Sequence, residues 1–233
     1  MPLISDPILE VCVDCYESIK NATEGGANRL ELCSALSEDG LTPSIGLAKL
    51  AMEVSSVPVF AMIRIRSGDF VYMPQEIDSM VEDVLELKKL GIAGFVFGAL
   101  DDRNNIDASA CKKIIEAANP RPVTFHRAFD QVANPLAALE QIRKLGFKRI
   151  LTSGQKQSAL EGTRLLAELV EKAADDIIII PGAGINEHNI GQIKDETAAR
   201  EFHGSAKKST NCPKGITVTD KDTVQRMVKI LNR

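Results

Sequence analysis

The sequence contains no tryptophan and few other aromatic residues, with only 8 Phe and 2 Tyr among 233 residues. Proteins that bind single-stranded nucleic acids stack the bases on aromatic side chains, so this class is disfavoured. Positive charge is not in excess either, because 28 Lys and Arg are outnumbered by 32 Asp and Glu. A formal charge of -4 at pH 7 gives no general attraction to a phosphate backbone. We therefore expect no nucleic-acid partner.

Long hydrophobic runs are also missing. The two longest apolar stretches, residues 57–63 and 91–100, are well short of the ~20 residues that span a bilayer. The first 14 residues carry acidic side chains early and lack a basic region before an apolar run, so they do not resemble a signal peptide. Five cysteines without a regular framework are typical of free thiols in a reducing compartment. We therefore expect a cytoplasmic protein with no membrane partner.

The sequence does contain a regular alternation of short aliphatic runs and longer segments of helical periodicity. The predicted strands cover residues 9–13, 29–32, 59–63, 94–97, 123–125, 149–151, 177–180 and 201–203. The predicted helices cover residues 16–24, 44–54, 75–90, 108–118, 135–145, 159–173, 187–196 and 220–231. Such alternation favours parallel strand pairing through βαβ units. Eight pairs with no linker predict that residues 1–233 form one α/β domain, a single (β/α)8 TIM-like barrel, with a doubly wound sheet as the alternative.

Glycines mark the ends of several predicted helices. Gly25, Gly91 and Gly146 each follow a helical segment and precede the next strand by a few residues. This position favours a left-handed backbone conformation that closes the helix, and glycine adopts it readily. We therefore predict left-handed caps at all three glycines.

Three irregular stretches follow predicted strands. Residues 34–43, 64–74 and 205–219 follow the second, third and eighth strands. In a parallel barrel these loops lie together at the carboxyl-terminal face, where barrel enzymes build their active sites. We therefore expect functional residues in these loops and at the strand ends beside them.

The first two predicted strands alternate aliphatic and polar residues. A strand directs successive side chains to opposite faces, so the polar set should point into the barrel interior. Its members are Glu10, Cys12, Arg29, Glu31 and Cys33. Buried charges cost several kcal/mol each, and aliphatic residues usually fill a barrel interior, so this pattern favours a functional site. A layer of ion pairs without chemistry is the alternative, above all for Glu10 and Arg29.

Two further predicted strands carry histidines at their ends. His126 directly follows the fifth strand, and His203 lies in the eighth. Histidine changes its charge near neutral pH, which suits proton transfer. We therefore predict Glu10, Glu31, His126 and His203 as catalytic acid/base candidates. Each histidine could instead be a core residue that is hydrogen-bonded to a neighbour.

The loops also predict a site for an anion. Arg64 and Arg66, after the third strand, could hold a carboxylate or phosphate between two guanidinium groups. Small residues after the last three strands let backbone N–H groups approach an anion, as in barrel phosphate sites. The candidate anion-binding residues are Arg64, Arg66, Ser153, Gly182, Gly184 and Ser205. The glycines could also serve only to turn the chain.

The first two strands repeat one Glu-x-Cys triplet, which ends at Cys12 and at Cys33. If the strands pair with these triplets in register, the two thiols lie side by side at the ~5 Å spacing of neighbouring strands. Two thiolates form a suitable site for Cu(I). Buried cysteine is also a common space-filling residue, which leaves a structural role as the alternative.

With these residues the sequence resembles the CutC family of copper homeostasis proteins. The matching segments are residues 10–12 (Glu-Val-Cys), 25–33 (Gly-Gly-Ala-Asn-Arg-Leu-Glu-Leu-Cys), 40–44 (Gly-Leu-Thr-Pro-Ser), 63–70 (Ile-Arg-Ile-Arg-Ser-Gly-Asp-Phe), 123–130 (Val-Thr-Phe-His-Arg-Ala-Phe-Asp), 151–154 (Leu-Thr-Ser-Gly) and 201–206 (Glu-Phe-His-Gly-Ser-Ala). They extend over nearly the whole chain. The resemblance implies a TIM-like barrel, a cytoplasmic location that extends to the nucleus in animals, and a homo-oligomer, either dimer or tetramer. It also implies a role in copper handling, with Cu(I) held by Cys12 and Cys33.

Two loops depart from the family pattern. Ile65 and Ser67 stand where the family usually has Pro and Gly, although both neighbouring arginines are present. Residues 206–219 form a shorter loop than is usual before the last helix, which puts a lid role for this loop in doubt. Three hypotheses follow. The protein binds copper through the thiols, or it is an enzyme that uses acid/base chemistry on a small anionic or phosphorylated metabolite. The third alternative is an interaction scaffold without chemistry.

Overall fold

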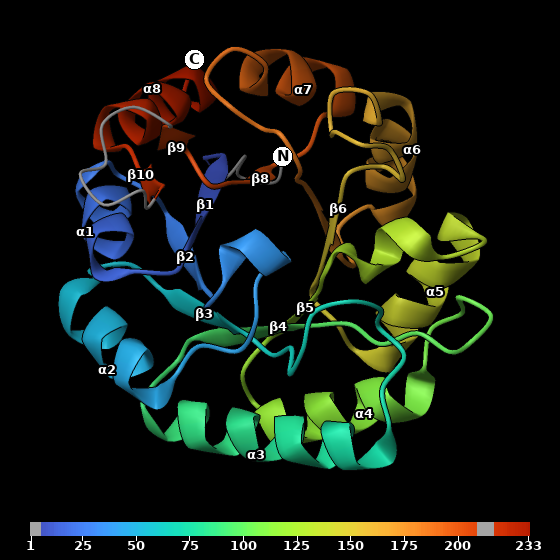
Figure 1. Cartoon of the computed structure of the whole chain (residues 1–233). Coiled ribbons are helices and arrows are strands. Elements are labelled where there is room, and N and C mark those ends of the chain that lie inside the picture. Colours follow the sequence, from blue (N-terminus) through green and yellow to red (C-terminus); the bar gives the residue numbers. More distant parts are fainter. Residues whose placement is uncertain (1–5, 209–216) are drawn as a thin grey trace.

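A computed structural model describes residues 6–208 and 217–233 of the chain. At its centre eight parallel strands form one sheet that curves into a nearly closed barrel (Figure 1). They are hydrogen-bonded in the order β8-β1-β2-β3-β4-β5-β6-β7. Their bounds are β1 (Ile8–Val13), β2 (Arg29–Leu32), β3 (Val59–Met62), β4 (Gly94–Phe97), β5 (Val123–Phe125), β6 (Arg149–Thr152), β7 (Ile178–Pro181) and β8 (Glu201–Gly204). This order around the barrel confirms the predicted TIM-like fold.

Helices form an outer ring around the strands (Figure 1). Their bounds are α1 (Tyr16–Glu24), α2 (Ile45–Val54), α3 (Pro74–Lys89), α4 (Ala108–Ala118), α5 (Pro135–Leu145), α6 (Thr163–Ala173), α7 (Ile190–Thr197) and α8 (Lys221–Leu231). Short 3₁₀ helices η1 (Leu36–Glu38) and η2 (Arg127–Gln131) follow β2 and β5. In residues 6–208 and 217–233, every helix is too short or too polar to cross a membrane.

Side-chain caps set where several helices begin. Ser44, Asp107, Asn134 and Asp220 each accept a hydrogen bond from the backbone N–H three residues later. Helix α7 begins at Ile190, three residues later than predicted, because Asn186 and Asn189 hold a turn there. The N–H of Asn186 donates to Oδ1 of Asn189 at 2.8 Å.

Most of the predicted loop of residues 205–219 lies outside the described residues, since residues 209–216 are not described. Its two ends form a short antiparallel pair, β9 (Lys207–Lys208) with β10 (Val218–Thr219).

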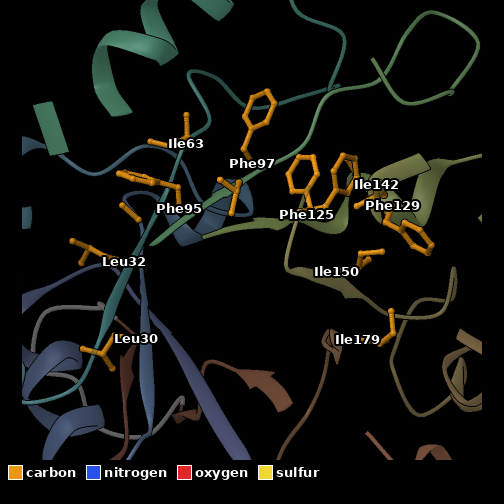
Figure 2. Packing of buried hydrophobic residues seen from close by; sticks show 14 of the residues in the cluster. Leu30, Leu32, Ile63, Phe95, Phe97, Phe125, Phe129, Ile142, Ile150 and Ile179 are labelled. Carbon is orange, nitrogen blue, oxygen red and sulfur yellow. The ribbon is translucent and has the colours of Figure 1, made fainter. Parts of the chain in front are cut away.

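The main hydrophobic core lies between the strands and the helices, as the alternating pattern predicted. Figure 2 shows part of it, including Phe95, Phe97 and Phe125 from β4 and β5. The ring of Phe125 packs edge-on against Phe147 at 5.2 Å between centroids. A second, smaller cluster consists of Cys33, Phe60, Met62 and Val96. The residues that alternate with these on β3 belong to the main core, so the small cluster occupies the barrel interior.

The structure corrects one of the three predicted glycine caps. Gly91 and Gly146 have φ angles of 87° and 100°, as predicted, whereas Gly25 has a φ of -74°. Gly26 takes the left-handed conformation instead, with a φ of 88°. Gly25 is needed for space, because a Cβ atom there would lie 2.7 Å from Cβ of Val224 on α8.

Alanine at these two neighbouring glycines should therefore act by different mechanisms. Gly25→Ala forces α1 and α8 apart, and overpacking of this kind costs about 1–3 kcal/mol. Gly26→Ala meets no atom within 4 Å but must adopt a positive φ. Left-handed strain of this kind costs about 1–2 kcal/mol. Urea denaturation measures both losses. Val224→Gly removes the Cβ atom that the new methyl group would meet, so it should relieve part of the first loss and none of the second, while the carbonyl oxygens of Asn21 and Lys221 stay in place at 2.9 Å. Equal losses for Gly25→Ala in the presence and absence of Val224→Gly would contradict the steric explanation.

Candidate functional site

A layer of buried ion pairs crosses the barrel interior. Arg29 on β2 contacts Glu10 on β1 and Glu201 on β8, each at 2.5 Å between nitrogen and oxygen. Arg149 on β6 reaches the same oxygen of Glu201 at 3.0 Å. The guanidinium groups of Arg29 and Arg149 lie 5.0 and 5.4 Å from the ring centre of Phe60. For Glu10 and Arg29 the structure therefore shows the ion-pair layer that was the alternative interpretation of the sequence.

Glu10 connects this layer to His203. One carboxylate oxygen of Glu10 accepts from Arg29, and the other lies 2.8 Å from Nδ1 of His203. Burial opposes ionisation of Glu10, but the charge of Arg29 and the hydrogen bond of His203 lower its pKa to about 2. The Glu10 carboxylate thus accepts a hydrogen bond from the Nδ1–H of His203 and fixes the orientation of the imidazole ring.

Cys12, Glu31 and His203 form the candidate metal group of the site. Each offers one ligand atom, and these atoms lie within 4.8 Å of one another. All three residues are buried, on the adjacent strands β1, β2 and β8. The Nε2 atom of His203 lies 3.7 Å from Oε2 of Glu31, and Oε1 of Glu31 has no hydrogen-bond partner in the described residues. A buried carboxylate oxygen without a partner, beside a thiol and an imidazole, fits a bound metal ion.

The charges of this group depend on one another. Burial disfavours the charged form of His203, but attraction to Glu31 and contacts with Cys12 and Glu10 raise its pKa well above the ordinary value. Burial, only partly offset by the charge of His203, raises the pKa of Glu31. Without a metal ion, the imidazolium of His203 therefore balances the surrounding acidic groups, and a metal ion would displace its Nε2 proton.

Cys33 lies outside the candidate metal group. The strand register places Cys12 opposite Glu31, so Cys33 lies two residues farther along the chain, just past the end of β2. The condition for side-by-side thiols, pairing of the two Glu-x-Cys triplets in register, is not met, because the two triplets are offset by two residues. The Sγ atom of Cys33 lies 3.5 Å from Oε2 of Glu31, and burial raises the pKa of its thiol. Its role as a copper ligand stays a prediction.

A cavity of about 470 Å³ opens beside this group at the carboxyl-terminal mouth of the barrel. Residues from the ends of β1, β2, β5, β7 and β8 contribute to its lining. The predicted site residues in the lining are Cys12, Glu31, Arg64, His126, Gly184, His203 and Ser205. The predicted residues Glu10, Cys33, Arg66, Ser153 and Gly182 are not part of it. The sequence therefore located the mouth but not every residue that faces it.

His126 is held in one tautomer. Its Nδ1 atom accepts the backbone N–H of Ala128 at 3.2 Å, so the neutral ring carries its proton on Nε2. Burial, followed by the positive charge of Arg64, lowers the pKa of His126 to about 3. The Nε2 atom has no hydrogen-bond partner in residues 6–208 and 217–233. His126 is thus a neutral hydrogen-bond donor at the cavity wall.

The structure separates the two arginines of the predicted clamp. Arg66 lies outside the cavity lining, where it pairs with Glu76 at 2.6 Å and with Asp69 at 3.0 Å. These contacts attach the loop after β3 to the start of α3. The two-arginine clamp is therefore wrong, because Arg66 is already neutralised by carboxylates of its own loop and helix.

Arg64 is buried and does line the cavity. Its guanidinium donates to the backbone carbonyls of Glu38 at 2.7 Å, Gly40 at 3.4 Å and Gly68 at 2.9 Å. Its Nε atom has no hydrogen-bond partner among the described residues, and no carboxylate there forms a salt bridge with it. Arg64 is therefore a desolvated cation without an anionic partner.

Asp130, in η2, was not predicted as a site residue. Its carboxylate accepts hydrogen bonds from the backbone N–H of Ser153 at 3.0 Å and of Gln155 at 3.3 Å. The sequence assigned Ser153, in the loop after β6, to an external anion. Asp130 is the last residue of the family-like segment 123–130, in the loop that follows β5, and its place in that segment was the signal that could have found it. The structure therefore does not leave Ser153 free for a ligand.

The three residues predicted in the loops after β7 and β8 have different roles. A Cβ atom at Gly182 would lie 2.5 Å from Cδ1 of Leu151, so close packing explains this glycine. Gly184 and Ser205 do line the cavity. Of the predicted loop residues, these two remain able to contact a ligand.

Comparisons with known proteins agree with one another. The sequence model of the CutC family matches residues 7–208. A human protein named copper homeostasis protein cutC homolog is 48% identical over 202 residues, which cover 87% of this chain and 74% of that protein. A family protein CutC from Pasteurella multocida is 46% identical, with 85% and 82% covered.

Solved structures show the same similarity. The putative copper homeostasis protein CutC from Streptococcus agalactiae superimposes with a TM-score of 0.81 at 32% identity, covering 85% of this chain and 98% of that one. Thiamine phosphate pyrophosphorylase from Pyrococcus furiosus has a TM-score of 0.64 at 15% identity, covering 96% and 95%. The second similarity concerns the fold alone.

Proposed function

The chain belongs to the CutC family, and from this premise we propose that it acts in copper homeostasis by holding Cu(I) in the mouth of its barrel. The observation that supports this proposal most directly is the group of Cys12, Glu31 and His203, with its ligand atoms within 4.8 Å. Thiolate and imidazole are ligands that copper prefers. Copper is here the cargo of the protein.

Each residue of the group has a distinct task in this proposal. Cys12 supplies the thiolate, and His203 supplies Nε2 once its proton has been displaced. Glu10 orients His203 through Nδ1, as carboxylates commonly do for metal-binding histidines. Cys33 supplies a second thiol beside Glu31, whose Oε2 atom lies 3.5 Å from its Sγ. Cu(I), which is a soft ion, would then bind the Cys33 thiolate in place of the Glu31 carboxylate.

The surroundings of the protein are part of the same proposal. The cysteines within the described ranges are free thiols, and a reducing cytoplasm would keep them available for Cu(I). We propose that the protein is located in the cytoplasm, and also in the nucleus in an animal cell. We propose further that it is a homo-oligomer.

Anaerobic titration with Cu(I) and a competing chelator tests the proposal. Cys12→Ser should weaken copper binding by about 100-fold or more, because it removes the thiolate nearest to His203. Cys33→Ser should weaken it less, because Cys33 lies outside the 4.8 Å group. Cys111→Ser is the matched control, since Cys111 is also buried but belongs to α4. Unchanged affinity in Cys12→Ser would remove the proposed copper site.

Acid/base enzymology is the second candidate function, and the cavity is the observation that favours it. Glu31, His126 and His203 line this cavity, while Glu10 is committed to Arg29 and His203. An enzyme of this kind would need a substrate to fill the space beside the metal group.

A further inference from the structure

The cavity is much larger than a copper ion requires. Its volume is about 470 Å³. A single water molecule takes about 30 Å³ of liquid, and sites for small organic molecules have about 300–1,000 Å³. Cys12, Glu31 and His203 lie together on the β8-β1-β2 side. The remaining wall comes from the ends of β3, β5, β6 and β7, and copper binding does not account for it.

Arg64 supplies this wall with a positive charge that forms no salt bridge with any described residue. The lining also contains the carboxylates of Glu31, Asp39 and Asp130, of which Asp130 pairs with Arg127. The residue is 3% exposed, and its hydrogen bonds go to backbone carbonyls. Carbonyl dipoles hold the guanidinium in place but do not neutralise it. A buried charge without a counter-charge is costly, and natural proteins usually pair such a charge or present it to a ligand. An anion in the cavity would provide the missing counter-charge.

His126 supplies a hydrogen-bond donor on the same wall. The residue is 3% exposed, and its ring lies 4.8 Å from the ring of Phe70, which also lies 5.0 Å from the Arg64 guanidinium. Its protonated Nε2 has no acceptor among the described residues. A buried donor without an acceptor costs about 1–3 kcal/mol. An oxygen atom of a bound molecule would satisfy it.

The opposite rim offers polar groups of a different kind. Gly184 and Ser205 line the cavity, and their backbone N–H groups make no hydrogen bond to any residue of the described ranges. The Ser205 hydroxyl is likewise free of partners within those ranges. Lys207, also in the lining, is only loosely paired, with Nζ 3.8 Å from Asp14. These groups can contact the far end of a molecule that reaches across the mouth.

We propose that this cavity binds a small organic anion, a metabolite that carries a carboxylate or phosphate group. The anionic group lies against Arg64 and the Nε2–H of His126, and the rest of the molecule extends toward Gly184 and Ser205. Carboxylates and phosphates share the oxygen acceptors that both wall groups require. This site does not depend on the thiols, so it goes beyond the copper proposal.

Nuclear magnetic resonance titration of the full chain tests the site. Inorganic phosphate and malonate serve as the two probes, with sodium chloride at equal ionic strength as the control. Saturable shifts of the His126 ring signals and of the Gly184 and Ser205 amides are the expected result. A tighter response to one probe identifies the preferred anionic group.

Matched variants assign the charge that binds the probe. Arg64→Met should weaken binding about tenfold or more, because a charged hydrogen-bonding partner is lost. Arg66→Met removes the same charge two residues away in the same loop, but from a side chain outside the cavity, and should leave binding unchanged. His126→Phe keeps a ring in place and removes the donor, so it provides a second weakened variant if Arg64→Met does not fold.

Two results would overturn the inference. One is the absence of saturable shifts with both probes in the unaltered protein. The other is equal weakening by Arg64→Met and Arg66→Met, which would indicate a general charge effect. Cys12→Ser separates this site from the copper proposal, because it should weaken copper binding by about 100-fold or more and leave phosphate and malonate binding unchanged. Loss of copper binding and loss of anion binding are therefore measured independently.

Discussion

Arg29→Met is expected to lower the free energy of unfolding by about 3–5 kcal/mol, one of the largest effects of any single substitution in this chain. Arg29 is 4% exposed and provides the charge between Glu10 and Glu201, which are 0% and 3% exposed. Methionine fills a similar volume but leaves two buried carboxylates facing each other with one fewer cation. The cost arises from the unpaired charges, because a complete ion-pair layer contributes little net stability.

Urea denaturation followed by circular dichroism measures the Arg29→Met effect. Arg143→Met is the matched control, because Arg143 pairs with Glu140 and Asp176 at the surface. Exposed pairs of this kind contribute about 0–1 kcal/mol. A loss below about 1 kcal/mol for Arg29→Met would show that Arg149 alone can neutralise the layer, and would contradict this account of the barrel interior.

Much of the fold could be predicted from local patterns. The strands lie within about one residue of their predicted bounds, because short aliphatic runs between helical segments leave little freedom in where a strand can lie. Alternation correctly directed Glu10, Cys12, Arg29 and Glu31 to the interior. The ends of strands were also the right place to search for the site, since His126 and His203 both line the cavity.

The register between neighbouring strands could not be predicted from the same alternating pattern. A barrel closes only if its strands are staggered relative to one another. An offset of two residues keeps every side chain on its face, so the alternating pattern is the same with or without it. The sequence therefore showed that Cys12 and Cys33 lie on adjacent strands, but it did not show that Cys12 lies opposite Glu31.

Loop residues were the other source of error, for a physical reason. Arg64 and Arg66 look equivalent in the sequence, yet their roles depend on backbone directions that no periodicity specifies. Arg66 reaches Glu76 on the following helix, whereas Arg64 folds back onto the carbonyls of two loops. The sequence therefore identified the loop that lines the cavity, but only the structure shows that Arg64, and not Arg66, faces it.

His126 should make the protein less stable in mild acid. Its pKa of about 3 in the folded chain lies far below the ordinary value of 6.5. Because the folded-state pKa is lowered, the stability that this residue contributes is present above pH 6.5 and is lost as the pH falls toward 3. The difference between the two pKa values of His126 corresponds to on the order of 5 kcal/mol of unfolding free energy, of which about 2 kcal/mol is lost between pH 6.5 and pH 5.

The groups around His126 explain why its neutral form is retained. Arg64 and Arg127 add positive charge, and the rings of Phe70, Phe97 and Phe125 surround the imidazole. His203 does not produce the same signal, because its pKa is raised. Below pH 6.5 it is charged in both the folded and the unfolded chain, so its contribution to stability stays constant there.

Unfolding free energies measured by urea denaturation at pH 7, 6 and 5 test this expectation against His126→Phe. The variant loses the acceptor for the Ala128 N–H, which lowers its stability by a similar amount at each pH. The readout is therefore the change in unfolding free energy with pH. Between pH 7 and pH 5 the unaltered protein should lose about 2 kcal/mol more than His126→Phe. Equal slopes would mean that His126 binds its proton at the same pH in the folded and the unfolded chain. The ring would then be charged at pH 5 in the folded protein, which would contradict a buried imidazole that stays neutral and accepts the Ala128 N–H over this pH range.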